Sequence, residues 1–136
     1  MSDAADADIA LLRQVLRQWE QGDFWDAAPY ADDVVFVRAG PDPGEYHGLD
    51  GLATAWRDFL GAWEDFRIAP ERIVPADGGT YVLLIRLQGR GKGSGMEIDA
   101  EVANLVRMRD GRIAHLEMHW DREAALTAAG ASEGAG

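Results

Sequence analysis

The stretch that decides the fold is residues 96–121, MEIDAEVANLVRMRDGRIAHLEMHWD, in which two alternating segments flank an Asp-Gly turn. Alternation of apolar and polar residues over this length predicts two antiparallel strands joined as a hairpin. One face of the hairpin is almost entirely apolar and the other is charged, so only one of them suits the interior. The face that looks inward therefore decides what the protein can do.

The two faces of this hairpin predict different functions. The apolar face holds Ile98, Ala100, Val102, Asn104, Val106, Leu116, Met118 and Trp120. The charged face holds Glu97, Asp99, Glu101, Arg107, His115, Glu117, His119 and Asp121. An inward apolar face predicts a pocket for a hydrophobic small molecule, because such pockets have apolar walls and few polar groups. An inward charged face predicts an acid–base enzyme, because paired carboxylates and imidazoles transfer protons.

The turn at residues 109–111 sets which residues lie opposite one another. A two-residue Asp-Gly turn would pair Arg109 with Arg112 and place Glu101 beside Trp120. A three-residue turn with a bulge would pair Met108 with Arg112. We favour the three-residue turn, which sets Asn104 opposite Leu116, Val102 opposite Met118, Glu101 opposite His119 and Asp99 opposite Asp121.

The remainder of the chain predicts helices first and strands afterwards. Apolar residues at helical spacing predict helices over residues 6–21 and 49–65, and Asp23 is placed to cap a short helix over 23–28. Residues 39–48 are expected to form a loop, because they hold two Pro and three Gly. Strands are expected over 34–37, 66–75, 80–90, 96–108 and 112–120, with a last helix over 122–128. This order predicts an α+β fold with the helices packed on one face of a mostly antiparallel sheet.

Length and composition limit the class of protein. We expect a single domain over residues 1–128 and a disordered tail over 129–136, since 136 residues suit one domain. The net charge of −11 argues against a nucleic-acid partner, and no apolar run suggests a membrane span. The absence of Cys excludes disulfides and thiolate chemistry. We expect a cytoplasmic protein with no cofactor and no bound metal.

Several short motifs resemble a known superfamily when they are taken in order. They are Gly22-Asp23-Phe24, Tyr30-Ala31-Asp32-Asp33-Val34, His47-Gly48 and Asp110-Gly111-Arg112-Ile113, with the ending Asp121-Arg122-Glu123-Ala124-Ala125-Leu126. The chain resembles the nuclear-transport-factor-2-like superfamily, and its SnoaL-like branch in particular. The resemblance implies a cone in which a strongly curved sheet wraps three N-terminal helices around a deep pocket. It also implies a homodimer.

The resemblance does not carry a reaction with it, because one fold hosts many activities. Positions that are catalytic in ketosteroid isomerases align with Val15, Arg38 and Asn104. The last-strand Asp of the cyclases and epoxide hydrolases aligns with Met118. Isomerase, cyclase or dehydratase chemistry without a cofactor therefore stays open beside simple ligand binding or a non-catalytic dimeric assembly domain.

Two sets of candidate site residues follow from the two faces. With the apolar face inward, Arg38, Arg86 and Asn104 would polarise a carbonyl-bearing or cyclic metabolite. The expected walls of that pocket are Tyr30, Trp56, Trp63, Gln88, Val102, Met118 and Trp120. With the charged face inward, the rival catalytic set is Asp99, Glu101, His119 and Asp121, whose carboxylates would stand about 5 Å from their cross-strand partners. A solvated or dimer-facing surface is the competing interpretation of that second set.

Overall fold

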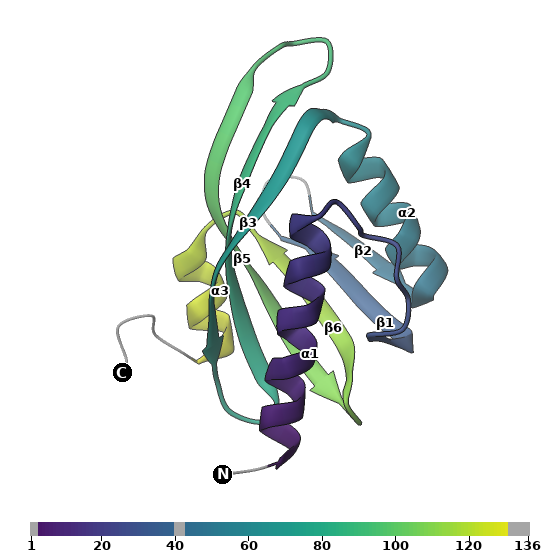
Figure 1. The fold of residues 1–136 in the computed structure, drawn as a ribbon, viewed down its shortest axis with the longest axis vertical. Helices are drawn as coiled ribbons and strands as arrows, with labels where there is room; N and C mark the ends of the chain where they lie inside the picture. The colour runs from purple at the N-terminus through teal and green to yellow at the C-terminus, as the bar shows by residue number, and fades with distance from the viewer. Residues whose placement is uncertain (1–2, 40–42, 131–136) are drawn as a thin grey trace.

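The fold is one six-stranded sheet with helices on both of its faces (Figure 1). This computed structural model describes residues 3–39 and 43–130. The helices are α1 (Asp3–Glu20), α2 (Gly48–Leu60) and α3 (Arg122–Ala129). The strands are β1 (Tyr30–Arg38), β2 (Gly44–His47), β3 (Trp63–Pro75), β4 (Thr80–Gly91), β5 (Glu97–Arg109) and β6 (Arg112–His119).

The sheet runs in the order β2-β1-β6-β5-β4-β3, so the first strand lies beside the last. The β1–β6 pair is parallel, and every other pair of this sheet is antiparallel. The sheet is curved and open, and with its helices it forms the expected α+β cone. The fold class predicted from the sequence is confirmed.

The main hydrophobic core lies between the sheet and the first two helices. Leu12, Val15 and Trp19 of α1 are at most 2% exposed, and they pack with Leu52 of α2 against the inner face of the sheet. Spacings of three and four residues place these side chains of α1 on one stripe of the helix. The apolar face of the hairpin joins this core through Val102, Val106, Leu116 and Met118, so it is the inward face.

The third helix corrects the expectation that all helices share one face. Helix α3 packs on the outer face, where its Ala125 and Leu126 cover Val82 and Leu84 of β4. Only two helices therefore precede the main run of strands, and the cone is wrapped on two N-terminal helices where three were expected. Asp121 caps α3 by accepting a hydrogen bond from the backbone N–H of Glu123 at 3.0 Å.

Two local predictions are wrong for reasons visible in the structure. Residues 23–27 are not helical, because Asp23 and Asp26 each accept a hydrogen bond from the backbone N–H two residues later. Such turns compete with helix formation. Part of the expected loop at 39–48 is the short strand β2, whose Tyr46 pairs with Phe36 of β1.

The register of the β5–β6 hairpin also differs from the expectation. The turn is the two-residue Asp110-Gly111 turn, which pairs Arg109 with Arg112, and Asp110 and Gly111 both have positive φ. A bulge then shifts the register between Arg107 and Met108 and sets Asn104 opposite Met118. Because of the bulge, apolar residues of both strands still lie on one face and charged residues on the other. The cross-strand pairs, however, differ from the predicted ones.

Two expectations concern the extent of the domain and of its C-terminal tail. One domain over residues 1–128 stays a prediction. Of the expected tail, Ala129 ends α3 and Gly130 is its left-handed C-cap, whereas residues 131–136 lie outside the described residues.

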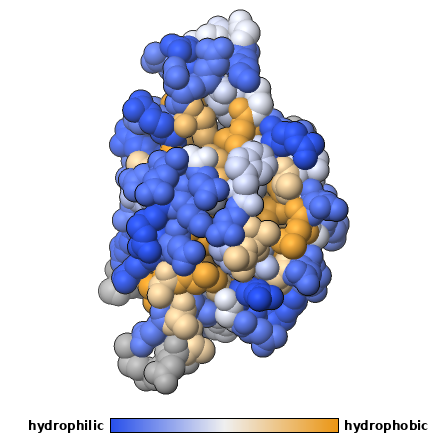
Figure 2. All heavy atoms as spheres, turned by 45° about the vertical axis from the view of Figure 1, so that its right-hand side comes forward, coloured by the Kyte–Doolittle hydropathy of each residue, from blue (hydrophilic) through white to orange (hydrophobic). Residues whose placement is uncertain are grey.

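The surface of the molecule is rich in hydrophilic residues, as expected from a chain with a net charge of −11. The face in Figure 2 is mostly hydrophilic, with hydrophobic patches near its middle. None of the helices within the described residues combines the length and apolar character needed to cross a lipid bilayer.

Candidate functional site

A small apolar cavity lies between α2 and the inner face of the sheet. Its volume is about 20 Å³, which is room for one water molecule. The lining residues come from five strands and one helix: Phe36, Ala55, Trp56, Phe59, Phe66, Ile68, Ile85, Leu87, Asn104 and Met118. In this conformation the cone is therefore nearly filled by its own side chains.

Aromatic rings do most of this filling. Phe59 of α2 packs edge-on against Phe66 with ring centroids 5.3 Å apart, and its centroid is 6.4 Å from that of Trp120. Trp56 stacks at a tilt on Phe24, 4.6 Å away. Phe59 and Trp56 lie one helical turn apart on α2, so one stripe of this helix supplies both rings.

Two residues with polar side-chain atoms line this apolar space. Trp56 Nε1 is buried and has no hydrogen-bond partner among the described residues. Asn104 lines the same cavity and is 6% exposed. A buried N–H without an acceptor is destabilising by about 1–3 kcal/mol, so this site is poised to gain from an acceptor atom.

A wider groove opens next to the cavity and shares Phe59 with it. Its volume is about 460 Å³, and it is lined by Arg38, Ala39, Asp58, Phe59, Ala62, Trp63 and Trp120. Volumes of this size are typical of small-molecule sites. Phe59 thus borders both the groove and the inner cavity.

The structure brings together only part of the predicted pocket. Trp56, Asn104 and Met118 line the cavity, and Arg38, Trp63 and Trp120 line the groove. Val102 is fully buried in the core and lines neither space.

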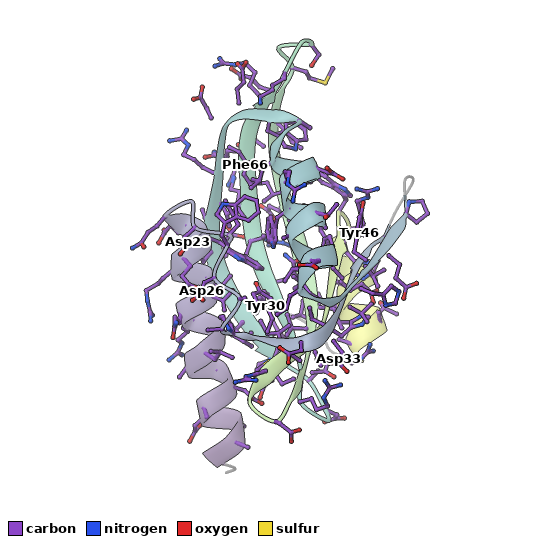
Figure 3. All side chains as sticks on the ribbon, turned by 90° about the vertical axis from the view of Figure 1, so that its right-hand side faces the viewer. Asp23, Asp26, Tyr30, Asp33, Tyr46 and Phe66 are labelled. Atoms are coloured by element: carbon purple, nitrogen blue, oxygen red, sulfur yellow. The ribbon has the colours of Figure 1, made fainter. Side chains whose placement is uncertain are left out.

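Tyr30 is also a core residue. It is 4% exposed, and burial raises the pKa of its hydroxyl well above the ordinary value. Figure 3 shows it well below Phe66, which lines the cavity. Tyr30 therefore stays protonated and supports packing.

Arg86 and Gln88 are corrections to the predicted pocket, because both lie on the outer face. Arg86 binds Asp99 through two hydrogen bonds, Nε–Oδ1 at 2.6 Å and Nη2–Oδ2 at 2.9 Å. Gln88 lies in the same row of β4 and is the cross-strand partner of Asp99. The hydrogen bond from Arg86 lowers the pKa of the Asp99 carboxyl, despite the opposing effect of desolvation.

The rival catalytic set does not assemble into a site. Asp99 is held by Arg86, Asp121 caps α3, and Glu101 Oε2 lies 3.2 Å from Nη1 of Arg122. His119 lies opposite Ala103 and not opposite Glu101. The two close carboxylate–partner pairs expected from the sequence are therefore absent, and the apolar face keeps these residues away from the cavity.

A histidine–glutamate–histidine row on β6 is the notable polar feature of the outer face. Glu117 bridges His115 and His119, with Oε2 3.0 Å from Nε2 of His115 and Oε1 2.6 Å from Nε2 of His119. Burial alone would raise the pKa of Glu117, but hydrogen bonds and charge interactions with both histidines bring it below the ordinary value. Within the described part of the chain, no group of three or more His, Cys, Asp or Glu side chains is arranged to hold a metal.

Sequence reasoning missed three aromatic residues of the site. Phe36, Phe59 and Phe66 line the cavity, and Phe59 also lines the groove. The buried stripe of α2 contained Phe59, so helical spacing identified its face but not its place at a cavity.

Comparison with known proteins identifies relatives of the chain. Residues 12–116 match the family model of the SnoaL-like domain. No curated protein matches the chain.

Solved structures agree with this fold at low sequence identity. An NTF2-like protein of unknown function from Burkholderia pseudomallei has 21% identity and a TM-score of 0.74, over 96% of this chain and 100% of that one. TerC, co-crystallised with polyporic acid, has 18% identity and a TM-score of 0.71, over 87% and 94%. A ketosteroid isomerase-like protein from Catenulispora acidiphila, in complex with trimethylamine, has 16% identity and a TM-score of 0.70, over 90% and 93%. These likenesses show the fold alone.

Proposed function

Because the chain belongs to the SnoaL-like domain family, we propose that its cone binds a hydrophobic small molecule that carries a hydrogen-bond acceptor such as a carbonyl. The observation that carries the proposal is the buried, unpartnered Nε1 of Trp56, a residue that lines the apolar cavity together with Asn104. Indole N–H is a donor only, and an amide supplies two donors. A ligand carbonyl would supply the acceptor that Trp56 Nε1 lacks.

Ligand size requires the groove and the cavity to act together. A space of about 20 Å³ is too small for a ring compound, whereas the adjacent groove of about 460 Å³ is large enough. Phe59 borders both, so displacement of its ring would join them. Among the solved structures of this fold, TerC was co-crystallised with polyporic acid, which supports a small-molecule ligand.

Ligand binding is better supported than acid–base catalysis. Of the described residues that line the inner cavity, none is Asp, Glu or His. Isomerase, cyclase or dehydratase chemistry needs a base beside the reacting carbon. Asp58 of the groove is the carboxylate available to such a reaction.

The expected homodimer belongs to the same proposal. Val35 and Val37 of β1 lie half-buried on the outer face beside the row of His115, Glu117 and His119. A second copy would cover these apolar side chains. Val37→Lys should then halve the mass measured by light scattering, and an unchanged mass would contradict a dimer through this face. The cytoplasmic location expected from the sequence stays a prediction.

The binding proposal is tested with two matched probes, 2-naphthaldehyde and naphthalene. Titration followed by protein NMR should show tighter binding of the aldehyde, by about tenfold for one well-placed hydrogen bond to a buried donor. Shift changes should include Phe36 and Met118. Equal affinities for the two probes would overturn the role of the donors.

Variants separate the donors from the aromatic walls. Trp56→Phe keeps a ring and removes the N–H, and Asn104→Leu removes the amide at similar volume. Each should reduce the preference for the aldehyde, while Trp63→Phe in the groove serves as the control. An aldehyde preference that persists in both donor variants would contradict the proposal.

A further inference from the structure

A second groove lies on the opposite side of the molecule from α2, between helix α1 and the edge strand β3. Its volume is about 630 Å³, within the range of small-molecule sites. It shares no lining residue with the inner cavity or with the groove around Phe59. It is therefore a separate site, and it does not depend on the proposed function of the cone.

The groove combines an apolar floor with a basic rim. Leu16 of α1 is 5% exposed and forms part of the floor, together with half-buried Ile9 and Ile73. Arg13 and Arg17 of α1 stand along one side of the groove. Apolar surface beside guanidinium groups suits a ligand with a hydrocarbon body and an anionic head.

The charges of the groove favour an anion despite the acidic chain as a whole. Arg13 and Arg17 lie four residues apart on the exposed side of α1 and form no ion pair with the described residues. Like charges at this spacing destabilise a helix, and a bound anion would offset that repulsion. Two carboxylates also line the groove: Glu71 is paired with Arg122, and Glu20 lies exposed at the C-terminal end of α1.

The edge strand favours a small ligand over a peptide. β3 is the outermost strand, so a peptide could in principle add to its free edge. Pro70 and Pro75 both line the groove, and a proline has no backbone N–H to donate to an added strand. These prolines weaken the edge as a template for strand addition.

We propose that the groove between α1 and β3 binds an anionic amphiphile, with an alkyl or aryl body on Leu16, Ile9 and Ile73 and a carboxylate or phosphate head at Arg13 and Arg17. Arg72 of β3 lines the same groove from the other side.

The test compares decanoate with 1-decanol by calorimetry and by NMR shift mapping on the full chain. Decanoate should bind with shift changes on α1 and β3, and decanol should bind at least about tenfold more weakly. Raising the salt concentration should weaken decanoate binding, because the rim is exposed. Shift changes confined to Phe36 and Met118, or no binding at millimolar decanoate, would overturn the proposal.

A double variant isolates the basic rim. Arg13→Gln with Arg17→Gln removes both charges and keeps good helix-forming residues, so α1 should stay folded. This variant should lose about tenfold or more in decanoate affinity. Arg57→Gln, an exposed arginine on α2 outside the groove, is the control and should bind as the unchanged protein does. Equal affinity in the double variant would contradict the proposal.

A peptide arm separates the two classes of partner. Hexaglutamate carries anionic charge without an apolar body, so it should bind more weakly than decanoate. Binding of hexaglutamate at this groove with an affinity equal to or above that of decanoate would overturn the amphiphile and point to an acidic protein segment.

Discussion

The two faces of the β5–β6 hairpin come from alternating residues of one stretch of chain but differ in polarity, burial and charge. On the inner face, Asn104 and Met118 are paired across the strands and sit against aromatic rings at a small cavity. On the outer face, charged side chains find partners close at hand, as in the row of His115, Glu117 and His119. The cavity at the inner face is also lined by Trp56 of α2, whose Nε1 has no partner among the described residues, whereas the charges of that row on the outer face are paired.

The inner face is therefore the one suited to bind a ligand, whereas the charged outer face is not. Partnered charges on an exposed surface contribute little to folding free energy. An unpartnered donor within an apolar wall is unfavourable until an acceptor arrives, and it therefore favours a bound ligand. The face that looks chemically richer in the sequence is thus the less reactive one in the structure.

The strongest way to break the comparison is to place a charge on the inner face. Met118→Asp buries an unpaired carboxylate beside Asn104 and should lower the free energy of unfolding by about 3 kcal/mol or more. Urea denaturation measures the loss. Arg107→Asp, an exposed position on the outer face, is the control and should change little. A small loss for Met118→Asp would indicate an open and hydrated interior.

Removing the ring between groove and cavity should have the next largest effect. Phe59→Ala should lower the free energy of unfolding by about 2–4 kcal/mol, because a half-buried ring with four aromatic neighbours is lost. Naphthalene should raise the melting temperature of this variant more than that of the unchanged protein. Equal effects of naphthalene on both would argue that Phe59 does not separate the two spaces.

A smaller effect is expected on the outer face, at Glu117. Its pKa is lowered in the folded state, so its stabilising contribution is present above the ordinary value of 4.5 and is lost as the pH falls through the lowered value. Glu117→Gln should therefore reduce stability at pH 7 by about 1 kcal/mol. The difference from the unchanged protein should shrink towards about pH 3. A difference that stays constant with pH would contradict this assignment.

The smallest effect is expected at the exposed Arg86–Asp99 pair. Arg86→Gln should leave the melting temperature near that of the unchanged protein, because both side chains are almost half exposed. The pKa of Asp99, held low by Arg86, should rise towards its ordinary value of 3.8. Carbon-13 NMR titration of the Asp99 carboxyl measures this change. A large loss of stability would show that the pair does more than satisfy surface charge.

Alternation was enough to predict the faces of the hairpin but not its register. The residues of β5 and β6 that the pattern assigned to a face lie on that face, since polar and apolar residues alternate there. The pairings were wrong because a two-residue turn followed by a bulge at 113–115 preserves the same faces. The sequence carries no strong signal for a bulge between apolar and polar residues.

The same reasoning failed on β4 for a different reason. Residues 80–85 are buried on both faces, because α3 covers Val82 and Leu84 from outside. Without alternation in that segment, Arg86 and Gln88 could not be assigned to a face. Nor could the sequence indicate that Trp56 Nε1 would lack a partner, since this depends on how other parts of the chain pack around it.

The pairing of β1 with β6 has a consequence for how the chain folds. Phe36 lies beside Leu116, 80 residues further along the sequence, so β1 has its parallel partner only when most of the chain is available. Contacts of long sequence separation slow folding because a large loop must close first. During synthesis, the β1–β2 hairpin would therefore lack its neighbouring strand until β6 has left the ribosome. Refolding should be slow, and a chain shortened before β6 should expose this hairpin to aggregation.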